Sequence, residues 1–300
     1  MLLVTGSIGI DTVETPFGKS RDCLGGSAIF FSLAASNFTD VRFLGVVGDD
    51  CPFDLKKLFA GRNVDLKGLE HRHGSKTFRW HGSYAGSMNE ATTKLTELNV
   101  LGEAPAIFPS AYTDSEYVFL ANTHPAIQLE ILSKVSGCRF CAADTMNLWI
   151  NNTKEQLAEM ISRIDLLFVN DAEARELTGS YNLVSACEKI LAMGPKTVIL
   201  KKGENGVFTA SNDGSFFALP AFPTREVVDP TGAGDSFAGG VMGYIAKAQS
   251  TQPEVMRNAI AYGTACASFA ISDFSTAGVQ KATPKLLEAR VEMLRSFVSF

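Results

Sequence analysis

The chain has 300 residues, of which 46% are hydrophobic and 20% charged, and its mean hydropathy is +0.09. This composition is typical of a globular protein with a substantial core, and it excludes the disordered and fibrous classes. The net charge of −5, without a dense block of Lys and Arg, argues against a nucleic acid partner. No apolar run reaches the roughly 18 residues that cross a bilayer, so no membrane partner is expected.

The first ten residues and the cysteines both predict a cytoplasmic protein. Residues 1–10 are apolar but lack the basic segment and the small-residue cleavage site of a signal peptide. Among the six cysteines, only Cys138 and Cys141 have the spacing of a metal or redox pair, and no further ligands at matching spacing lie nearby. We therefore expect ordinary reduced thiols.

Short stretches rich in β-branched and aromatic residues predict buried strands. They lie at residues 1–8, 41–47, 117–120, 140–143, 166–169, 197–201 and 206–210. Amphipathic helices are predicted between them, for example over residues 155–164 and 184–193. Apolar strands that alternate with such helices favour an α/β fold with a mostly parallel sheet and helices on both faces. We expect residues 1–300 to form one domain.

Two polar, turn-rich regions, residues 11–24 and 75–103, depart from this rhythm. The alternating character of the second region suggests half-exposed antiparallel strands, and together the regions are predicted to form a small sheet that closes over a cleft. The alternation leaves two choices for the cleft face: Thr77, Arg79 and His81, or Phe78 and Trp80. An exposed sheet edge invites pairing with a second copy, so a homodimer is compatible with the sequence.

The turn Asp229-Pro-Thr-Gly-Ala-Gly-Asp235 leads directly into a helix-like run. Its glycines allow successive amides, those of Gly232, Ala233 and Gly234, to point into one concavity, where the helix dipole helps to bind an anion. An aspartate beside an anion site is better suited to catalysis than to binding, because its charge would repel a phosphate. We therefore predict that Asp235 accepts a proton from an attacking hydroxyl during phosphoryl transfer. The alternative is that Asp235 only caps the helix.

Three segments resemble the ribokinase-like (PfkB) carbohydrate kinase family. Residues 229–240, Asp-Pro-Thr-Gly-Ala-Gly-Asp-Ser-Phe-Ala-Gly-Gly, are similar to its C-terminal signature, residues 24–35 to its paired-glycine segment, and residues 44–50 to the motif that follows. The resemblance implies a Rossmann-like three-layer α/β sandwich with a small β-sheet lid. It also implies an ATP-dependent kinase that uses Mg²⁺ and transfers the γ-phosphoryl group to a hydroxyl of a sugar or sugar-like molecule.

The resemblance also implies residues that bind the nucleotide. Asn170 and Glu173 match the motif that places Mg²⁺ and the phosphates through water, although an N-cap with acids in the first helical turn explains them as well. Lys201, Gly203 and Gly206 match the nucleotide-binding hairpin, although a simple turn is the alternative. Thr264 is a candidate for the adenine pocket, and Asp229 is a candidate ligand of a monovalent cation.

For the acceptor, the resemblance implies that Asp11 binds substrate hydroxyls and that Gly25 and Gly26 let the substrate approach the backbone. Asp11 could instead be a solvated loop acid. Two departures leave the acceptor open: Phe30 replaces a common asparagine, and the segment from Asp144 through Asn147 to Trp149 lacks an expected arginine. Asp144 and Asn147 remain candidates for the cleft, while Trp149 is more typical of packing.

Three functions are compatible with these residues. The first is a sugar kinase. The second is a nucleoside kinase of the same fold, in which Phe30, Phe78 and Trp80 could stack on a base. The third is a nucleotide- or sugar-binding protein that has lost catalysis, which the presence of Asp235 and its glycines disfavours.

Overall fold

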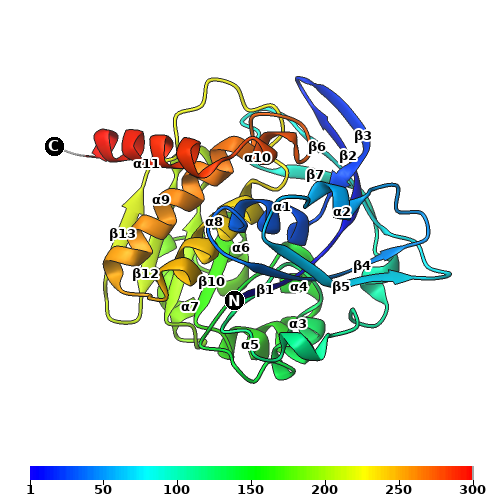
Figure 1. The fold of residues 1–300 in the computed structure, drawn as a ribbon. Helices are drawn as coiled ribbons and strands as arrows, with labels where there is room; N and C mark the ends of the chain where they lie inside the picture. Colours follow the sequence, from blue (N-terminus) through cyan, green and yellow to red (C-terminus); the bar gives the residue numbers. More distant parts are fainter. Residues whose placement is uncertain (299–300) are drawn as a thin grey trace.

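The computed structural model describes residues 1–298, and within them nine strands form one large sheet (Figure 1). Their order across the sheet is β13-β12-β11-β10-β9-β8-β1-β4-β5. The pairs are parallel except for β11–β12 and β12–β13, which are antiparallel. The bounds are β1 Leu2–Thr5, β4 Val41–Gly48, β5 Val64–Arg72, β8 Tyr117–Leu120, β9 Phe140–Asp144, β10 Leu166–Asn170, β11 Thr197–Lys201, β12 Val207–Ser211 and β13 Phe216–Leu219.

Helices cover both faces of this sheet (Figure 1). One apolar cluster lies under α1 (Ser27–Ala35), α8 (Ala233–Ala248), α9 (Pro253–Ala270), α10 (Ala277–Gln280) and α11 (Pro284–Val298), and the short α2 (Leu55–Leu58) joins it. The other lies under α3 (Pro125–Ser133), α4 (Asn147–Asn152), α5 (Lys154–Ser162), α6 (Asp171–Thr178) and α7 (Leu183–Leu191). Strands between two helical layers are buried on both faces, which explains their continuous apolar runs. The predicted three-layer α/β fold is confirmed.

Close packing of α8 fixes the position of the predicted catalytic turn that precedes it. A methyl group on Gly239 would lie 2.4 Å from the carbonyl oxygen of Phe31 in α1, and one on Gly240 would lie 2.8 Å from the Cα of Gly263 in α9. Larger side chains at these positions would push the helices apart. The small residues that follow the turn therefore hold α8 between two neighbouring helices.

A second, small sheet has the strand order β3-β2-β6-β7, with β2 Gly9–Thr15, β3 Gly18–Gly25, β6 Phe78–Tyr84 and β7 Ala91–Glu97. Its hairpin pairs β2–β3 and β6–β7 are antiparallel, as predicted, but β2 and β6 pair in parallel. The difference arises because each of these two strands enters from the large sheet, β2 after β1 and β6 after β5. The six other predicted strands and the two predicted helices lie within a few residues of the observed ones, whereas β5 and β13 were not predicted.

The expectation of a single strand over residues 1–8 is wrong. The first strand ends at Thr5, and the chain then passes into the small sheet at Gly9. Ser7 and Ser27 fix this passage, because the amide of each donates to the hydroxyl of the other, at 3.0 and 2.9 Å. A methyl group on Gly6 would clash with the same Ser27 hydroxyl at 2.6 Å. Among residues 1–298, no helix is both long and apolar enough to cross a membrane.

Candidate active site

The predicted catalytic turn begins α8 with Gly232 in the left-handed conformation, at a φ of +75°. Gly232 is the N-cap, so Asp235 is the third residue of the helix and the capping alternative for it is wrong. The helix has no side-chain cap, which leaves its first amides to other acceptors. One of the three predicted anion-binding amides, that of Ala233, donates to the Pro230 carbonyl at 3.2 Å.

The ring of Phe30 packs directly against this turn at Gly232. A methyl group on Gly232 would lie 2.3–2.4 Å from three atoms of the Phe30 ring, and Phe30 is only 1% exposed. Glycine is therefore required at position 232 for its conformation and for this contact. The ring is packed in the core against the turn. No observed contact tests whether Phe30 reaches the substrate, so that contact stays a prediction.

Asp11 lies on β2 with its carboxylate packed against glycine backbone. Methyl groups on Gly25 and Gly9 would lie 1.7 Å from Oδ2 and 2.7 Å from Oδ1 of Asp11. The side chain is buried, so Asp11 is not a solvated loop acid, and its Oδ1 has no hydrogen-bond partner among the described residues. Burial, together with the charges of Asp229 and Asp235, raises its pKa to about 8. A buried acceptor without a partner is suited to a ligand hydroxyl. Gly26, the N-cap of α1, has a φ of +103°.

Asp229 joins three segments around the site. Its Oδ1 accepts from the Thr231 amide at 2.9 Å, and its Oδ2 accepts from the Ser275 amide at 3.0 Å. The Ser275 hydroxyl donates to the carbonyl oxygen of Leu24, next to the paired glycines. Asp229 therefore ties the catalytic turn to the loop after α9 and, through Ser275, to β3. Burial raises its pKa, while the hydrogen bonds from Thr231 and Ser275 oppose the rise.

Asn170 and Glu173 form a capping box at the start of α6. The Glu173 amide donates to Asn170 Oδ1 at 2.7 Å, and the Asn170 amide donates to Glu173 Oε2 at 2.8 Å. The helix-capping alternative is thus confirmed as local structure, and the proposed contact with Mg²⁺ would use the remaining Oε1. Burial raises the pKa of Glu173, and the positive charge of Lys201 opposes that rise.

Lys201 brings a positive charge to the catalytic turn. A methyl group on Gly234 would lie 3.0 Å from Lys201 Nζ. The same lysine opposes the effect of burial, which raises the pKa of both Asp235 and Asp144. Asp144 is buried, and its Oδ1 has no partner among the described residues. The carboxyls of Asp144, Asp235 and Glu173 therefore lie within electrostatic reach of one lysine. Asp11 interacts with Asp229 and Asp235 but not with this lysine. The site thus has an excess of negative charge that a bound cation would relieve.

The other residues predicted to bind the nucleotide have local structural roles. Gly203 starts a short 3₁₀ turn and Gly206 ends it, and both have positive φ. A methyl group on Gly203 would lie 2.2 Å from Oδ1 of Asn89, in the β6–β7 turn of the small sheet. Thr264 is buried in α9, and its hydroxyl donates to the Ile260 carbonyl at 2.9 Å. Among the described residues, no contact joins Thr264 to the aspartates and the glutamate of the site. Asn147 donates to Glu176.

The small sheet turns an aromatic face toward the catalytic turn. Phe78, Trp80 and Tyr84 alternate along β6 and so share one face, and Asp11 shares it because it is the register partner of Trp80. The Thr231 hydroxyl donates to the Tyr84 hydroxyl at 3.4 Å. His81 lies on the opposite face, where it pairs with Glu14. The structure therefore selects the face of Phe78 and Trp80 from the two that the sequence left open.

Two residues of the site, Asn89 and Ser275, were missed in the sequence, because their partners lie far away along the chain. Thr231 belongs to the predicted turn and Tyr84 to the predicted lid, but the contact between them was not predicted. The alternation of Phe78 and Trp80 extends to Tyr84 and could have indicated its face.

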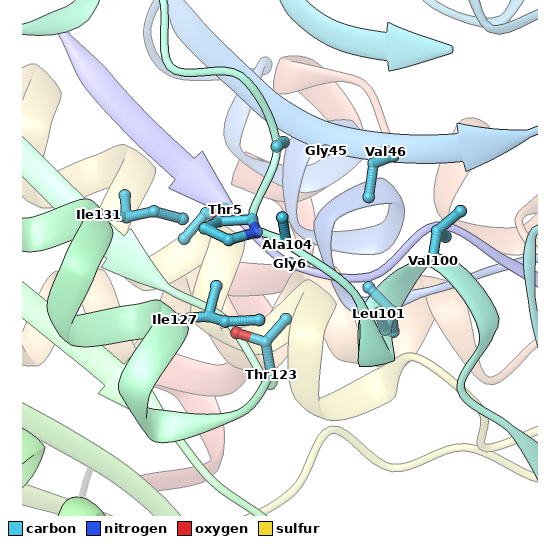
Figure 2. Close-up of a pocket in the computed structure, with 12 residues that line it drawn as sticks. Thr5, Gly6, Gly45, Val46, Val100, Leu101, Ala104, Thr123, Ile127 and Ile131 are labelled. Atoms are coloured by element: carbon cyan, nitrogen blue, oxygen red, sulfur yellow. The ribbon is translucent and has the colours of Figure 1, made fainter. Parts of the chain in front are cut away.

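A small cavity of about 20 Å³ lies at the end of β1 (Figure 2). Thr5, Gly6, Val100 and Ile131 are among the residues that line it, and its walls are mostly apolar. It has room for about one water molecule, so it is not a binding site for the acceptor.

Comparison with known proteins identifies the family. The sequence profile of the pfkB family carbohydrate kinases matches residues 23–283. The chain belongs to this family. A cytidine kinase of Thermococcus kodakarensis is 31% identical over 248 residues, which make up 80% of this chain and 87% of that relative. This kinase is therefore a phosphotransferase that acts on a hydroxyl group.

Solved structures share the fold of this kinase. A ribokinase from Cryptococcus neoformans in complex with ADP superimposes with a TM-score of 0.79 at 20% identity, covering 96% of this chain and 99% of the other. A nucleoside kinase of Burkholderia thailandensis in complex with inosine gives a TM-score of 0.78 at 17% identity, covering 99% of both chains. At these identities the likeness concerns the fold alone.

Proposed function

We propose that this kinase phosphorylates a nucleoside, and that the acceptor lies against the face of the small sheet that carries Asp11 and the aromatic side chains. The observation that carries the proposal is the common face of Asp11, Phe78, Trp80 and Tyr84. A carboxyl can bind the ribose hydroxyls while aromatic rings stack on the base. The similarity to a cytidine kinase supports the same acceptor. A nucleoside thus moves ahead of a free sugar, which the sequence alone ranked first.

In the proposed reaction, Asp235 accepts the proton of the attacking hydroxyl. Burial raises its pKa, which makes it a stronger base than an exposed aspartate. Amides of the first turn of α8, including that of Gly234, and the nearby Lys201 would stabilise the charge on the transferred phosphoryl group. The small sheet would act as a lid, because Tyr84 already reaches Thr231.

Mg-ATP is the proposed phosphoryl donor. Glu173 Oε1 and the unpartnered Asp144 Oδ1 are oxygen donors of the type that Mg²⁺ prefers, directly or through water. When bound, the ion would neutralise charge on the ATP phosphates. Lys201, Gly203 and Gly206 would lie along the nucleotide, with Asn170 holding Glu173 in place.

Three further proposals extend this function. The carboxylate oxygens of Asp229 already accept from the amides of Thr231 and Ser275. A monovalent cation beside Asp229 would therefore take most of its ligands from loop carbonyls. A homodimer would form through β7, the fully exposed edge strand of the small sheet. The location would be cytoplasmic, in keeping with six free cysteines.

The acceptor is tested by measuring ADP formation with nucleosides, ribose, hexoses and sugar acids. We expect one nucleoside to give the highest kcat/KM. A Trp80→Leu variant should reduce kcat/KM for that nucleoside more than for ribose, since only the nucleoside has a base to stack. A free sugar as the preferred substrate, with nucleosides inactive, would contradict the proposed acceptor.

A further inference from the structure

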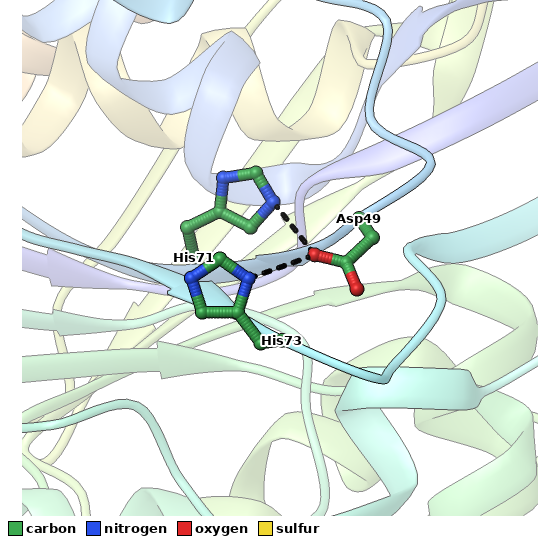
Figure 3. Close-up of side chains that lie close together, drawn as sticks. All are labelled: Asp49, His71 and His73. Atoms are coloured by element: carbon green, nitrogen blue, oxygen red, sulfur yellow. Dashed lines mark hydrogen bonds and ion pairs between the residues drawn. The ribbon is translucent and has the colours of Figure 1, made fainter.

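Asp49, His71 and His73 form an exposed cluster at the ends of β4 and β5 (Figure 3). The distances from Asp49 Oδ1 are 3.4 Å to His71 Nε2 and 3.1 Å to His73 Nδ1. The two imidazole rings are stacked, with centroids 5.3 Å apart and planes 18° from parallel. None of the active-site residues described above belongs to this cluster.

The chain builds the cluster from two neighbouring strands. His71 and His73 are two residues apart at the end of β5, so both side chains project from the same face. The pairing of Gly48 with Arg72 places Asp49, just beyond β4, next to both rings. The Gly74 amide donates to Asp49 Oδ2 at 2.7 Å, which orients the carboxylate so that Oδ1 faces the imidazoles.

The nitrogens of His71 and His73 and the oxygen Asp49 Oδ1 all carry lone pairs, so a hydrogen atom or a cation must lie between each nitrogen and the oxygen. An N–H on each ring can fill this role, because a carboxylate oxygen can accept two hydrogen bonds, and His73 Nδ1 lies at hydrogen-bond distance from Asp49 Oδ1. A divalent cation can replace both protons, because neutral imidazole and carboxylate are common ligands of zinc. Metal–ligand bonds of about 2.0–2.1 Å in a tetrahedron place neighbouring donors about 3.3 Å apart. The observed distances of 3.1 and 3.4 Å fit that spacing.

We propose that Asp49, His71 and His73 bind a zinc-class transition-metal ion, with the fourth position open to water. All three donor atoms lie within 4.8 Å of one another, so small rotations of exposed side chains suffice to close the site. Two imidazoles favour Zn²⁺, Co²⁺ or Ni²⁺ over Mg²⁺, which prefers oxygen ligands. The site is therefore distinct from the Mg²⁺ that accompanies ATP.

The position of the site links it to the small sheet. The Asp49 amide donates to the Ser75 carbonyl at 2.9 Å, and the neighbouring Asp50 accepts from the Thr77 amide at 2.6 Å. Asp50 also pairs with Arg79 of β6 at 3.2 Å. A bound ion would join the end of β4 to the segment that leads from β5 into β6. Metal binding should therefore stabilise the folded kinase by mass action.

The test is a titration of the full-length protein with Co²⁺ and Zn²⁺ in excess Mg²⁺, so that hard-oxygen sites are occupied. Co²⁺ should bind with one equivalent, give the visible absorption of a four-coordinate ion, and lack a thiolate charge-transfer band. Zn²⁺ should raise Tm. His73→Asn and Asp49→Asn should each weaken binding at least as much as loss of an outer-shell partner, about 10- to 100-fold.

His124→Asn is the matched control, since His124 lies on another part of the chain and caps α3 by accepting from the Ala126 amide at 3.2 Å, which Asn can also do. This variant should bind Co²⁺ like the wild type. Absence of saturable binding would overturn the proposal. So would equal affinity in His73→Asn, or a thiolate band, which would place the ion on cysteines.

Discussion

A methyl group on Gly25 would lie 1.7 Å from Oδ2 of Asp11, so the position of this carboxyl depends on the missing side chain of Gly25. The backbone of Gly25 does not adopt positive φ, so a Gly25→Ala substitution adds no backbone strain and acts through its clash with Asp11. We expect the displaced Asp11 to lose the hydrogen bond that we propose it makes to the acceptor. Leaving a buried polar group without its partner costs about 1–3 kcal/mol, which corresponds to a roughly 5- to 150-fold lower kcat/KM for the acceptor.

Gly102→Ala is the control for this substitution, because a methyl group there would make an ordinary contact of 3.4 Å with Leu98 Cβ. Both variants should fold, as judged by circular dichroism and Tm. If Gly25→Ala keeps the wild-type kcat/KM, Asp11 does not bind the acceptor as proposed.

The buried carboxyls predict a fall in stability as the pH rises. The pKa of Asp11 is about 8 in the folded protein and near 3.9 in an unfolded chain. Its protonated form therefore stabilises the fold at low pH, and this contribution is lost as the pH rises toward 8. Burial raises the pKa of Asp144, Asp229, Asp235 and Glu173 in the same direction. The ligand-free kinase should have a lower Tm at about pH 8 than at about pH 5.

Asp11→Asn should reduce this dependence on pH, because it removes one of the groups that must ionise. Acids with lowered pKa, such as Glu14 and Asp49, stay ionised over this range in both states. All other ionisable groups are the same in both proteins, so the difference between the Tm curves isolates Asp11. Identical slopes would show that Asp11 ionises as easily in the folded kinase as in the unfolded chain.

Asp235→Asn should abolish most of the activity while leaving substrate binding in place. General-base catalysis contributes typically about 10²- to 10⁴-fold, and kcat should fall by that factor with little change in KM for ATP. Asp213→Asn, in the exposed β12–β13 turn, is the control, since its side chain can still accept from the Ser215 amide. A folded Asp235→Asn protein that retained most of its rate would refute the assignment of the base.

The sequence predicted those strands and helices whose hydrophobic pattern is set by residues close together in the chain. Strands such as β4 are buried along their whole length, so their apolar runs are unbroken. The edge strand β5 was missed because its register with β4 shifts between Arg42 and Leu44. The extra residue changes which side chains face the core: Val64 and Leu66 come before the shift, and Leu69 after it. The alternation expected of a half-buried strand is therefore interrupted.

The site was predictable where one short motif contains it, as in the turn from Asp229 to Asp235. Contacts between distant segments were not. Ser275 reaches Asp229 across 46 residues, and Tyr84 reaches Thr231 across 147, and neither pairing leaves a pattern in the chain. The second contact depends on how the chain crosses from β5 in the large sheet to β6 in the small one, which local propensity does not determine.

Asn89 joins the small sheet to the predicted nucleotide hairpin and predicts a link between lid position and ATP binding. Its side chain donates to Glu204 Oε1 at 3.2 Å and accepts from the Glu204 amide at 3.3 Å. Asn89→Ala removes both bonds. Because hydrogen bonds of this kind contribute about 0.5–1.5 kcal/mol, KM for ATP should rise by roughly 2- to 10-fold. The neighbouring Glu90→Ala, in the same exposed turn, should leave KM unchanged. Equal KM values for the two variants would mean that the contact does not affect ATP binding, and the small sheet would then act on the acceptor alone.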